Sequence, residues 1–175
     1  MKVGLIVEGN NDEVAIEKLC KKIGITPEIR KQRGRINVRK ACSYAKDLIF
    51  KGCEKVIILS DAHCNKGKER ERLREVYKFC SDLKNKIHIC IVVNELESWL
   101  IADAEALSSY IGCTIKTGNP EEVHDAKGHL RETFKKVGKV YYTTTAREIA
   151  ERIDIYEVLK KCPSFGEFYN RVKDC

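Results

Sequence analysis

The sequence contains no apolar run approaching the ~20 residues that a membrane-spanning helix needs. Its first apolar stretch covers only Val3 to Val7 and is ended by Glu8, so it does not have the pattern of a secretory signal peptide. Nine cysteines are present but no Cys-x-x-Cys pair, the spacing that zinc ribbons and redox motifs use. We therefore expect a cytoplasmic protein without membrane contact, with most cysteines reduced and serving as small apolar residues.

The glycine-rich loops that cradle nucleotides are also missing. Neither Gly-x-x-x-x-Gly-Lys-Ser/Thr nor Gly-x-Gly-x-x-Gly occurs, so nothing supports nucleotide hydrolysis or dinucleotide binding by those devices. There are no internal repeats, no low-complexity tract and no long linker. With 175 residues, of which 43% are apolar and 34% charged, the chain is long enough to bury a core and has the composition of one globular domain.

Three short apolar runs, at 3–7, 56–59 and 87–93, are bounded by turn residues and predict buried parallel strands. The segment 26–34 is either an irregular edge or a short strand. Apolar residues at helical spacing predict the following helices: 13–24, 36–50, 66–83, 104–110, 121–136, 144–161 with a possible break near Asp154, and 164–172. The pattern predicts an α/β fold in which a parallel sheet flanked by helices (1–103) carries a helical carboxyl-terminal extension (104–175), together one structural unit.

Each predicted strand leads into acidic residues. Because the carboxyl ends of parallel strands meet at one edge of a sheet, these side chains are expected to converge there. Carboxylates are the ligands that Mg²⁺ and Mn²⁺ prefer in proteins. Glu95 and Glu97 are two residues apart where a helix begins, so that either one or both point inward. The candidate metal ligands are Glu8, Asp12, Asp61, His63 and Glu97, with Glu95 as a further candidate.

The chain is basic, with a net charge of +7, and one segment concentrates this charge. Residues 30–40 contain six cationic side chains and no acid, around Gly34. Two interpretations stay open: a loop that contacts phosphates of a nucleic acid, or a solvated basic loop with no ligand. We call this stretch the basic segment; its cationic residues are Arg30, Lys31, Arg33, Arg35, Arg39 and Lys40.

The acidic motifs together resemble the Toprim domain of topoisomerases, primases and OLD-type nucleases. The resemblance rests on Val7-Glu8-Gly9 with Asp12, on Ile58 to His63, and on Val92 to Glu97. The segments 95–103 and 162–165 further resemble a small stand-alone Toprim-like family of unknown function that is often encoded beside AAA-type ATPases. The family pattern has a glutamate after the first strand and Asp-x-Asp after a later one. In this chain, His63 stands where the second aspartate is expected, which shifts the metal preference or removes metal binding.

The resemblance implies metal-assisted phosphodiester chemistry, with Glu8 and Asp61 as catalytic residues and Mg²⁺ or Mn²⁺ as cofactor. In this interpretation the basic segment positions a nucleic acid, and Lys127 either stabilises developing charge or is an ordinary surface lysine. A nuclease is thus the leading hypothesis. The alternative is a non-catalytic nucleic-acid-binding or regulatory subunit of an ATPase complex, and a weaker one is a phosphatase or nucleotide-binding enzyme. The oligomeric state is left open.

Overall fold

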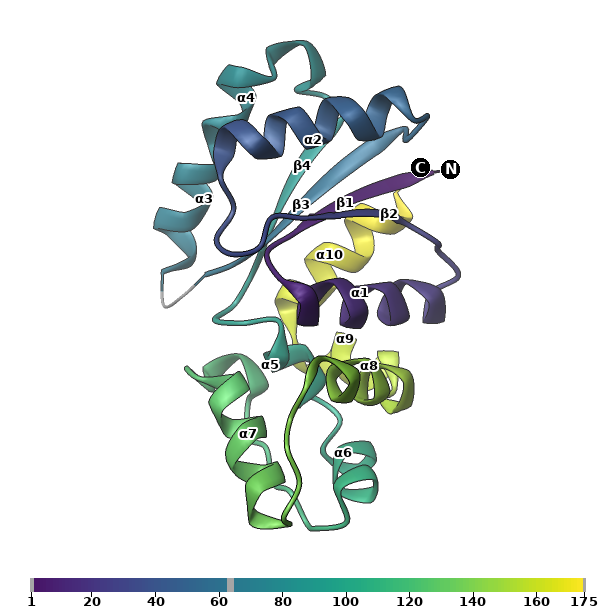
Figure 1. Cartoon of the computed structure of the whole chain (residues 1–175), viewed down its shortest axis with the longest axis vertical. Coiled ribbons are helices and arrows are strands. Elements are labelled where there is room, and N and C mark those ends of the chain that lie inside the picture. The colour runs from purple at the N-terminus through teal and green to yellow at the C-terminus, as the bar shows by residue number, and fades with distance from the viewer. Residues whose placement is uncertain (1, 63–64, 175) are drawn as a thin grey trace.

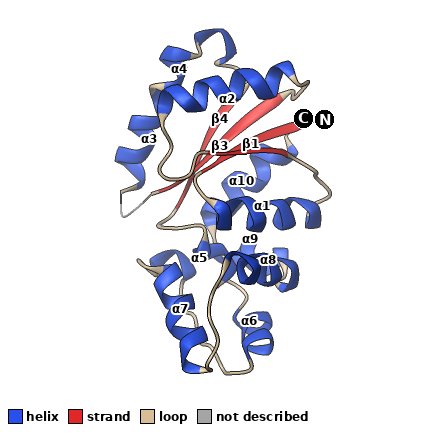
Figure 2. Cartoon of the chain, viewed as in Figure 1, coloured by secondary structure: helices blue, strands red, loops and turns tan. Residues whose placement is uncertain are grey.

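The strands form a single parallel sheet in the computed structural model, which describes residues 2–62 and 65–174 (Figures 1 and 2). In the sheet order β2-β1-β3-β4, the strands are β2 (Glu28–Lys31), β1 (Val3–Val7), β3 (Lys55–Asp61) and β4 (Ile87–Val92). This confirms the predicted α/β class with a parallel sheet flanked by helices. Of the two interpretations of segment 26–34, the short strand is correct, because β2 pairs with β1 from Gly4↔Glu28 to Val7↔Lys31.

Helices cover both faces of the sheet and continue into the carboxyl-terminal part of the chain (Figure 1). Several begin at a side-chain cap: Asn37, Asp103 and Asp125 each accept a hydrogen bond from a backbone N–H in the first helical turn. The α-helices are α1 (Asn10–Lys22), α2 (Val38–Phe50), α3 (Lys66–Arg74), α4 (Val76–Phe79), α5 (Glu97–Leu100), α6 (Ala104–Ile111), α7 (Ala126–Lys136), α8 (Thr143–Arg152), α9 (Ile155–Lys161) and α10 (Pro163–Lys173). Two short 3₁₀ turns, η1 (Ser81–Leu83) and η2 (Pro120–Glu122), complete the described elements.

Three of the predicted helices are divided or shortened. The possible break near Asp154 in the segment 144–161 is confirmed, because α8 ends at Arg152 and α9 begins at Ile155. The segment 66–83 divides into α3, α4 and η1, and a disulfide bond from Cys80 to Cys42 ties it to α2. The sequence did not predict this bond; the free cysteines among the described residues are Cys20, Cys53, Cys90, Cys113 and Cys162. The segment 121–136 becomes a helix only from Ala126, because Asp125 turns back to cap the N–H of Gly128 at 2.7 Å.

Strand alternation divides the apolar side chains between two core clusters. In β1, Leu5 and Val7 face the cluster that includes α1, α8 and α10, whereas Ile6 faces the cluster formed with α2, α3 and α4. The first cluster also contains Trp99 of α5, whose ring lies 5.0 Å from that of Phe165. The carboxyl-terminal helices therefore share a core with the sheet. No helix in the described part of the chain is both long and apolar enough to cross a bilayer.

The order of the strands positions the site. The chain passes from β1 outward to β2 and then returns to place β3 on the other side of β1. This reversal creates a topological switch point between the carboxyl ends of β1 and β3, where ligands of open α/β sheets bind. Glu8 directly follows β1, and Asp61 is the last residue of β3.

The close approach of α2 to β1 gives a test of this packing. A Cβ atom on Gly4 would lie 3.0 Å from Leu48 Cδ1 and 3.2 Å from Val56 Cγ2, so a side chain would fit only if these neighbours moved. We expect Gly4→Val to lower the free energy of unfolding by about 1–3 kcal/mol, measured by urea denaturation. Gly166→Val is the matched control, since nothing lies within 4 Å of its Cβ position. Equal losses in the two variants would contradict the packing.

Candidate functional site

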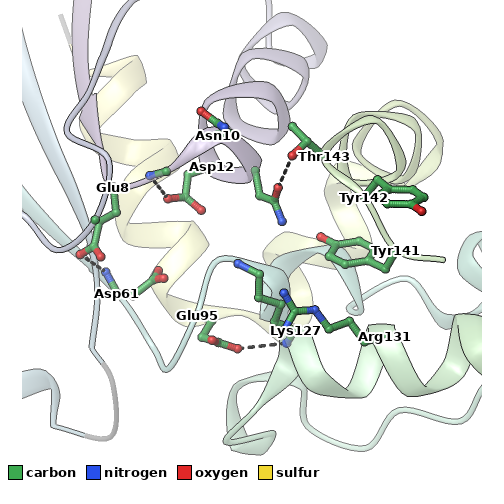
Figure 3. A pocket seen from close by; sticks show the side chains of 13 residues that line it. Glu8, Asn10, Asp12, Asp61, Glu95, Lys127, Arg131, Tyr141, Tyr142 and Thr143 are labelled. Carbon is green, nitrogen blue, oxygen red and sulfur yellow. Dashed lines mark hydrogen bonds between the residues drawn. The ribbon is translucent and has the colours of Figure 1, made fainter.

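Glu8 and Asp61 lie side by side at the switch point (Figure 3). The Glu8 carboxylate accepts hydrogen bonds from the Ser60 hydroxyl at 2.6 Å and from the Asp61 backbone N–H at 3.3 Å. Glu8 is thereby fixed by β3 although it follows β1. The two residues expected to be catalytic are therefore neighbours, and Glu8 is only 8% exposed.

Asp12 joins them from the first turn of α1. Its Oδ2 accepts a hydrogen bond of 2.7 Å from the N–H of Gly9, so it caps the turn that separates β1 from α1. Burial raises the pKa of Asp12 from 3.8 to about 6, and the nearby charge of Glu97 adds to the effect. Asp12 thus lies in the field of the other carboxylates, which outweighs the opposing effect of Lys127.

Asp61 is the centre of this acidic group. Its Oδ1 accepts a hydrogen bond from the backbone N–H of Leu96 at 3.1 Å. Burial raises the pKa of Asp61 well above its ordinary value, and the charges of Asp12, Glu8, Glu97 and Glu95 raise it further. Four other carboxylates therefore act electrostatically on this single side chain.

Glu95 and Glu97 both approach the site, at different depths. Glu95 borders the cavity and accepts a hydrogen bond from the backbone N–H of Lys127 at 3.0 Å. Glu97 is 1% exposed and lies deeper, where its Oε1 meets the Lys127 amino group at 3.3 Å and the side chains of Asn11 and Tyr141 at 3.2 and 3.4 Å. Of the two alternatives from the sequence, the one in which both residues point inward is therefore correct.

The acidic group opens into a cavity of about 510 Å³, which we call the acidic cavity (Figure 3). Its opposite wall comes from the carboxyl-terminal part of the chain. There, the Thr143 hydroxyl donates to Asn11 Oδ1 at 2.7 Å and so links α8 to α1. Sequence reasoning missed this wall because no motif marks its residues, which are Arg131, Tyr141, Tyr142 and Thr143.

Lys127 supplies positive charge within the acidic cavity, where the alternative was an ordinary surface lysine. Burial acts to lower the pKa of Lys127, but Glu97, Asp12 and Glu95 more than offset it and raise the pKa above its usual value. The ammonium group consequently stays charged at neutral pH. The pKa of Tyr141 is also raised, by burial and by the charge of Glu97. The Tyr141 hydroxyl therefore stays protonated and neutral, and it can donate to Glu97.

The basic segment is less available than its composition suggests. Three of its cations are held by acids from other segments: Arg30 by Asp47 at 2.9 Å, Lys31 by Glu13 at 2.5 Å and Arg35 by Glu69 at 2.5 Å. Arg39 lies over the ring of Phe79 and Lys40 over that of Tyr44, each 5.3 Å from the centroid. Arg33 is exposed at a left-handed φ of 65°. Arg33, Arg39 and Lys40 therefore remain as cations without an acidic partner within 4 Å among the described residues.

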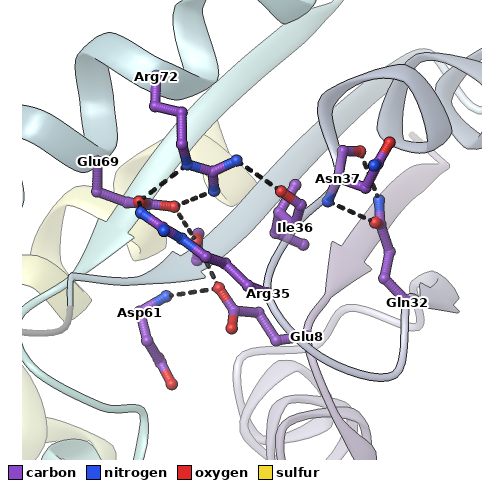
Figure 4. A network of polar contacts seen from close by, with 9 residues as sticks. Glu8, Gln32, Arg35, Ile36, Asn37, Asp61, Glu69 and Arg72 are labelled. Carbon is purple, nitrogen blue, oxygen red and sulfur yellow. Dashed lines mark hydrogen bonds and ion pairs between the residues drawn. The ribbon is translucent and has the colours of Figure 1, made fainter.

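The exposed Arg35 belongs to a polar network, centred on the buried Glu69, that reaches the site (Figure 4). Glu69 of α3 is 2% exposed and pairs with Arg35 and with Arg72, while its Oε1 lies 2.9 Å from the Ser60 hydroxyl that also contacts Glu8. Burial opposes ionisation of Glu69, but the hydrogen bonds from Arg72, Arg35 and Ser60 lower its pKa to about 2. Glu69 is thus a further glutamate near the switch point, and no sequence motif indicated it.

The donor chemistry of the acidic group fits a hard divalent cation, whereas its conformation is not that of a formed metal centre. Within residues 2–62 and 65–174, no three histidine, cysteine, aspartate or glutamate side chains are arranged to hold a metal ion. Each acid is instead hydrogen-bonded to a neighbouring backbone or side-chain donor. Ligation by three of these acids would therefore require side-chain rotation, and Glu97 would be available to a cation only after displacement of Lys127. His63, the remaining predicted ligand, lies outside the described residues.

The family model described as "Domain of unknown function (DUF4276)" matches residues 7–173. The chain belongs to this family. Among curated proteins, none matches the chain significantly. The DUF4276 match starts at the end of β1, includes every described candidate residue of the acidic cavity and ends at the last residue of α10. The acidic cavity and its carboxyl-terminal wall are therefore parts of a single family domain.

The raised pKa of Asp12 predicts that replacing this carboxyl group changes the stability of the protein in a pH-dependent way. A folded-state pKa of about 6 against 3.8 means that the folded protein holds this proton more tightly, so stability is lost as pH rises from about 4 to about 6. In EDTA, Asp12→Asn should be more stable than the wild type by roughly 1–3 kcal/mol at pH 7, with little difference below pH 4. Urea denaturation at both pH values measures this. Glu17→Gln, on the exposed side of α1, should follow the wild type; a pH-independent effect of Asp12→Asn would reject the assignment.

Proposed function

We propose that this DUF4276 protein is a divalent-metal-dependent enzyme of phosphodiester chemistry, a nuclease, acting on nucleic acid in the acidic cavity. The observation that carries the proposal is the position of Asp61, at a topological switch point and in the field of Asp12, Glu8, Glu97 and Glu95. Assembling buried like charges is unfavourable unless a cation or protons offset them. A bound Mg²⁺ or Mn²⁺ would offset them and would supply Lewis-acid activation of a phosphoryl oxygen.

The residues of the site have distinct roles in this proposal. Glu8, Asp61 and Asp12 hold the cation by their carboxylates, and Glu97 joins them when Lys127 moves away. Lys127 and Arg131, which lie on the same side of the acidic cavity, bind the phosphate and stabilise its developing negative charge. Tyr141 and Asn11 keep Glu97 oriented by hydrogen bonds. Arg33, Arg39 and Lys40 extend the contact along a nucleic-acid strand.

The Toprim resemblance, a cytoplasmic location and association with an AAA-type ATPase remain parts of this proposal. The proposed activity on nucleic acid requires access of a polyanion to the acidic cavity. Lys127, Arg131 and the unpaired cations of the basic segment supply positive charge that offsets the repulsion between the phosphates and the carboxylates.

A second candidate function is a non-catalytic nucleic-acid-binding or regulatory module. It is favoured by the ion pair of 3.3 Å between Lys127 and Glu97, because the ammonium group already neutralises one of the carboxylates. In that case the acids would be structural and the cations of the surface would carry the binding. The two candidates differ in whether the acidic cavity binds a divalent ion.

The first test removes charge from the two central acids. Glu8→Gln and Asp61→Asn should each weaken Mn²⁺ binding at least tenfold in calorimetric titration and abolish metal-dependent cleavage of single- or double-stranded DNA or RNA. Glu17→Gln is the control, because it neutralises an exposed glutamate of α1. Cleavage that survives both substitutions would reject the catalytic assignment. Retained binding of nucleic acid without Mn²⁺ or Mg²⁺ binding would favour the regulatory module.

A second test addresses Lys127. If the lysine and a metal ion compete for Glu97, Lys127→Met should raise Mn²⁺ affinity several-fold, because it removes the competing charge, while it lowers the cleavage rate. Lys135→Met, on the exposed part of the same helix, should change neither. Unchanged Mn²⁺ affinity in Lys127→Met would show that the lysine does not occupy the position of a cation.

A further inference from the structure

A second polar cavity lies on the open edge of the sheet, beside β4. Its volume is about 210 Å³, and three guanidinium groups, one imidazole and one phenol line it together with a single aliphatic residue. No carboxylate lines it. We call it the arginine cavity; its residues are Arg70, Arg74, Tyr77, His88, Ile89 and Arg171.

The cations of this cavity are incompletely neutralised. Arg70 pairs with Glu167 at 2.8 Å, but Arg74 and Arg171 are exposed and have no acidic partner within 4 Å among the described residues. Arg171 is close enough to His88 to contribute, after burial, to the lowering of the His88 pKa, so the imidazole stays neutral near pH 7. Tyr77 donates its hydroxyl proton to the Ile87 carbonyl at 3.3 Å, which leaves the guanidinium groups as the available donors.

Two helices bring these arginines together. Arg70 and Arg74 are four residues apart on one side of α3, while Arg171 comes from the last turn of α10 on the other side of the cavity. Like charges held around one small cavity repel each other, and no described acid of the lining compensates for Arg74 and Arg171. A tetrahedral oxyanion fits this arrangement, because guanidinium groups bind phosphate oxygens through paired N–H donors.

We propose that the arginine cavity is a binding site for a phosphate group, separate from the acidic cavity, and that it holds a backbone phosphate of a nucleic-acid strand. The charge pattern of α3 argues for a strand. Lys66, Arg70 and Arg74 follow one another at intervals of four residues and form a row of about 12 Å along the helix. This row begins where α3 starts, at the end of the sheet that carries Asp61, and leads to the arginine cavity.

The spacing between the two cavities suits a strand that reaches both. His88 precedes Val92, the register partner of Asp61, by four residues of β4, which corresponds to about 13 Å along the strand. A chain of a few nucleotides spans such a distance. The arginine cavity would then fix the strand on one side of the acidic cavity, without contributing to chemistry there.

The direct test is a titration of the ¹⁵N-labelled full chain with inorganic phosphate, in EDTA and at constant ionic strength. We expect saturable amide shifts confined to 70–77, 87–90 and 169–172. Arg74→Ala/Arg171→Ala should raise the apparent dissociation constant at least tenfold. Arg147→Ala, which removes an exposed arginine of α8, should leave it within twofold of the wild type. Non-saturable or dispersed shifts, or an equal loss in Arg147→Ala, would overturn the proposal.

The source of the phosphate is resolved by two further ligands, AMP and a fluorescent single-stranded 12-mer. If the site holds a strand phosphate, the double variant should bind the 12-mer more weakly than the wild type. The plot of the logarithm of the association constant against the logarithm of the salt concentration should also become less steep by about 1.4, since two phosphate contacts are lost. If the double variant binds AMP more weakly but binds the 12-mer as the wild type does, the site holds the phosphate of a free nucleotide. That result would overturn the proposal that it holds a backbone phosphate of a strand. Equal Mn²⁺ binding by the wild type and the double variant keeps this result independent of the acidic cavity, and equal melting temperatures verify folding.

Discussion

The hydrogen bonds from Ser60 and Asp61 to Glu8 are the constraint on which the site depends. They cross from β3 to the end of β1 and fix the side chain that follows the central strand. Without them, a buried glutamate beside Asp61 and Asp12 would turn away from the other negative charges. The donors are a backbone N–H and a neighbouring hydroxyl, and both orient the Glu8 carboxylate toward Asp61.

The architecture could be predicted because its signals are local. Three apolar runs ending in acids are sufficient to predict buried parallel strands, and the parallel arrangement then requires Glu8, Asp61 and Glu95 to meet at one edge. The interruptions in 66–83 and 121–136 were missed for a physical reason. Asp125 lies within a helical pattern of apolar residues. Its side chain accepts a hydrogen bond from a backbone N–H at the start of α7, and this cap favours a helix that begins at Ala126 over one that runs through Asp125. The bond between Cys42 and Cys80 joins positions that only the tertiary fold brings together.

The chemistry of the site could be predicted only in part, because charge in sequence does not reveal pairing in space. The basic segment contains no acid of its own, yet Asp47, Glu13 and Glu69 neutralise half of its cations from other elements. Conversely, Arg74 and Arg171 are 97 positions apart and gave no sequence signal, although the fold places them on one cavity. The wall formed by 141–143 is invisible for the same reason, since its contact with Asn11 spans 132 positions.

Ser60 lies between Glu8, which the sequence motifs indicated, and Glu69, which they did not. Its hydroxyl has one proton, while carboxylate oxygens of Glu8 and Glu69 lie 2.6 and 2.9 Å away, so it can donate to only one of them at a time. Glu69 also accepts hydrogen bonds from Arg72 and Arg35, and these lower its pKa more than the one from Ser60 does. The shorter contact belongs to Glu8. Arg35 and Arg72 therefore contribute to the site indirectly: by satisfying Glu69, they leave the serine hydroxyl to orient the glutamate at the switch point.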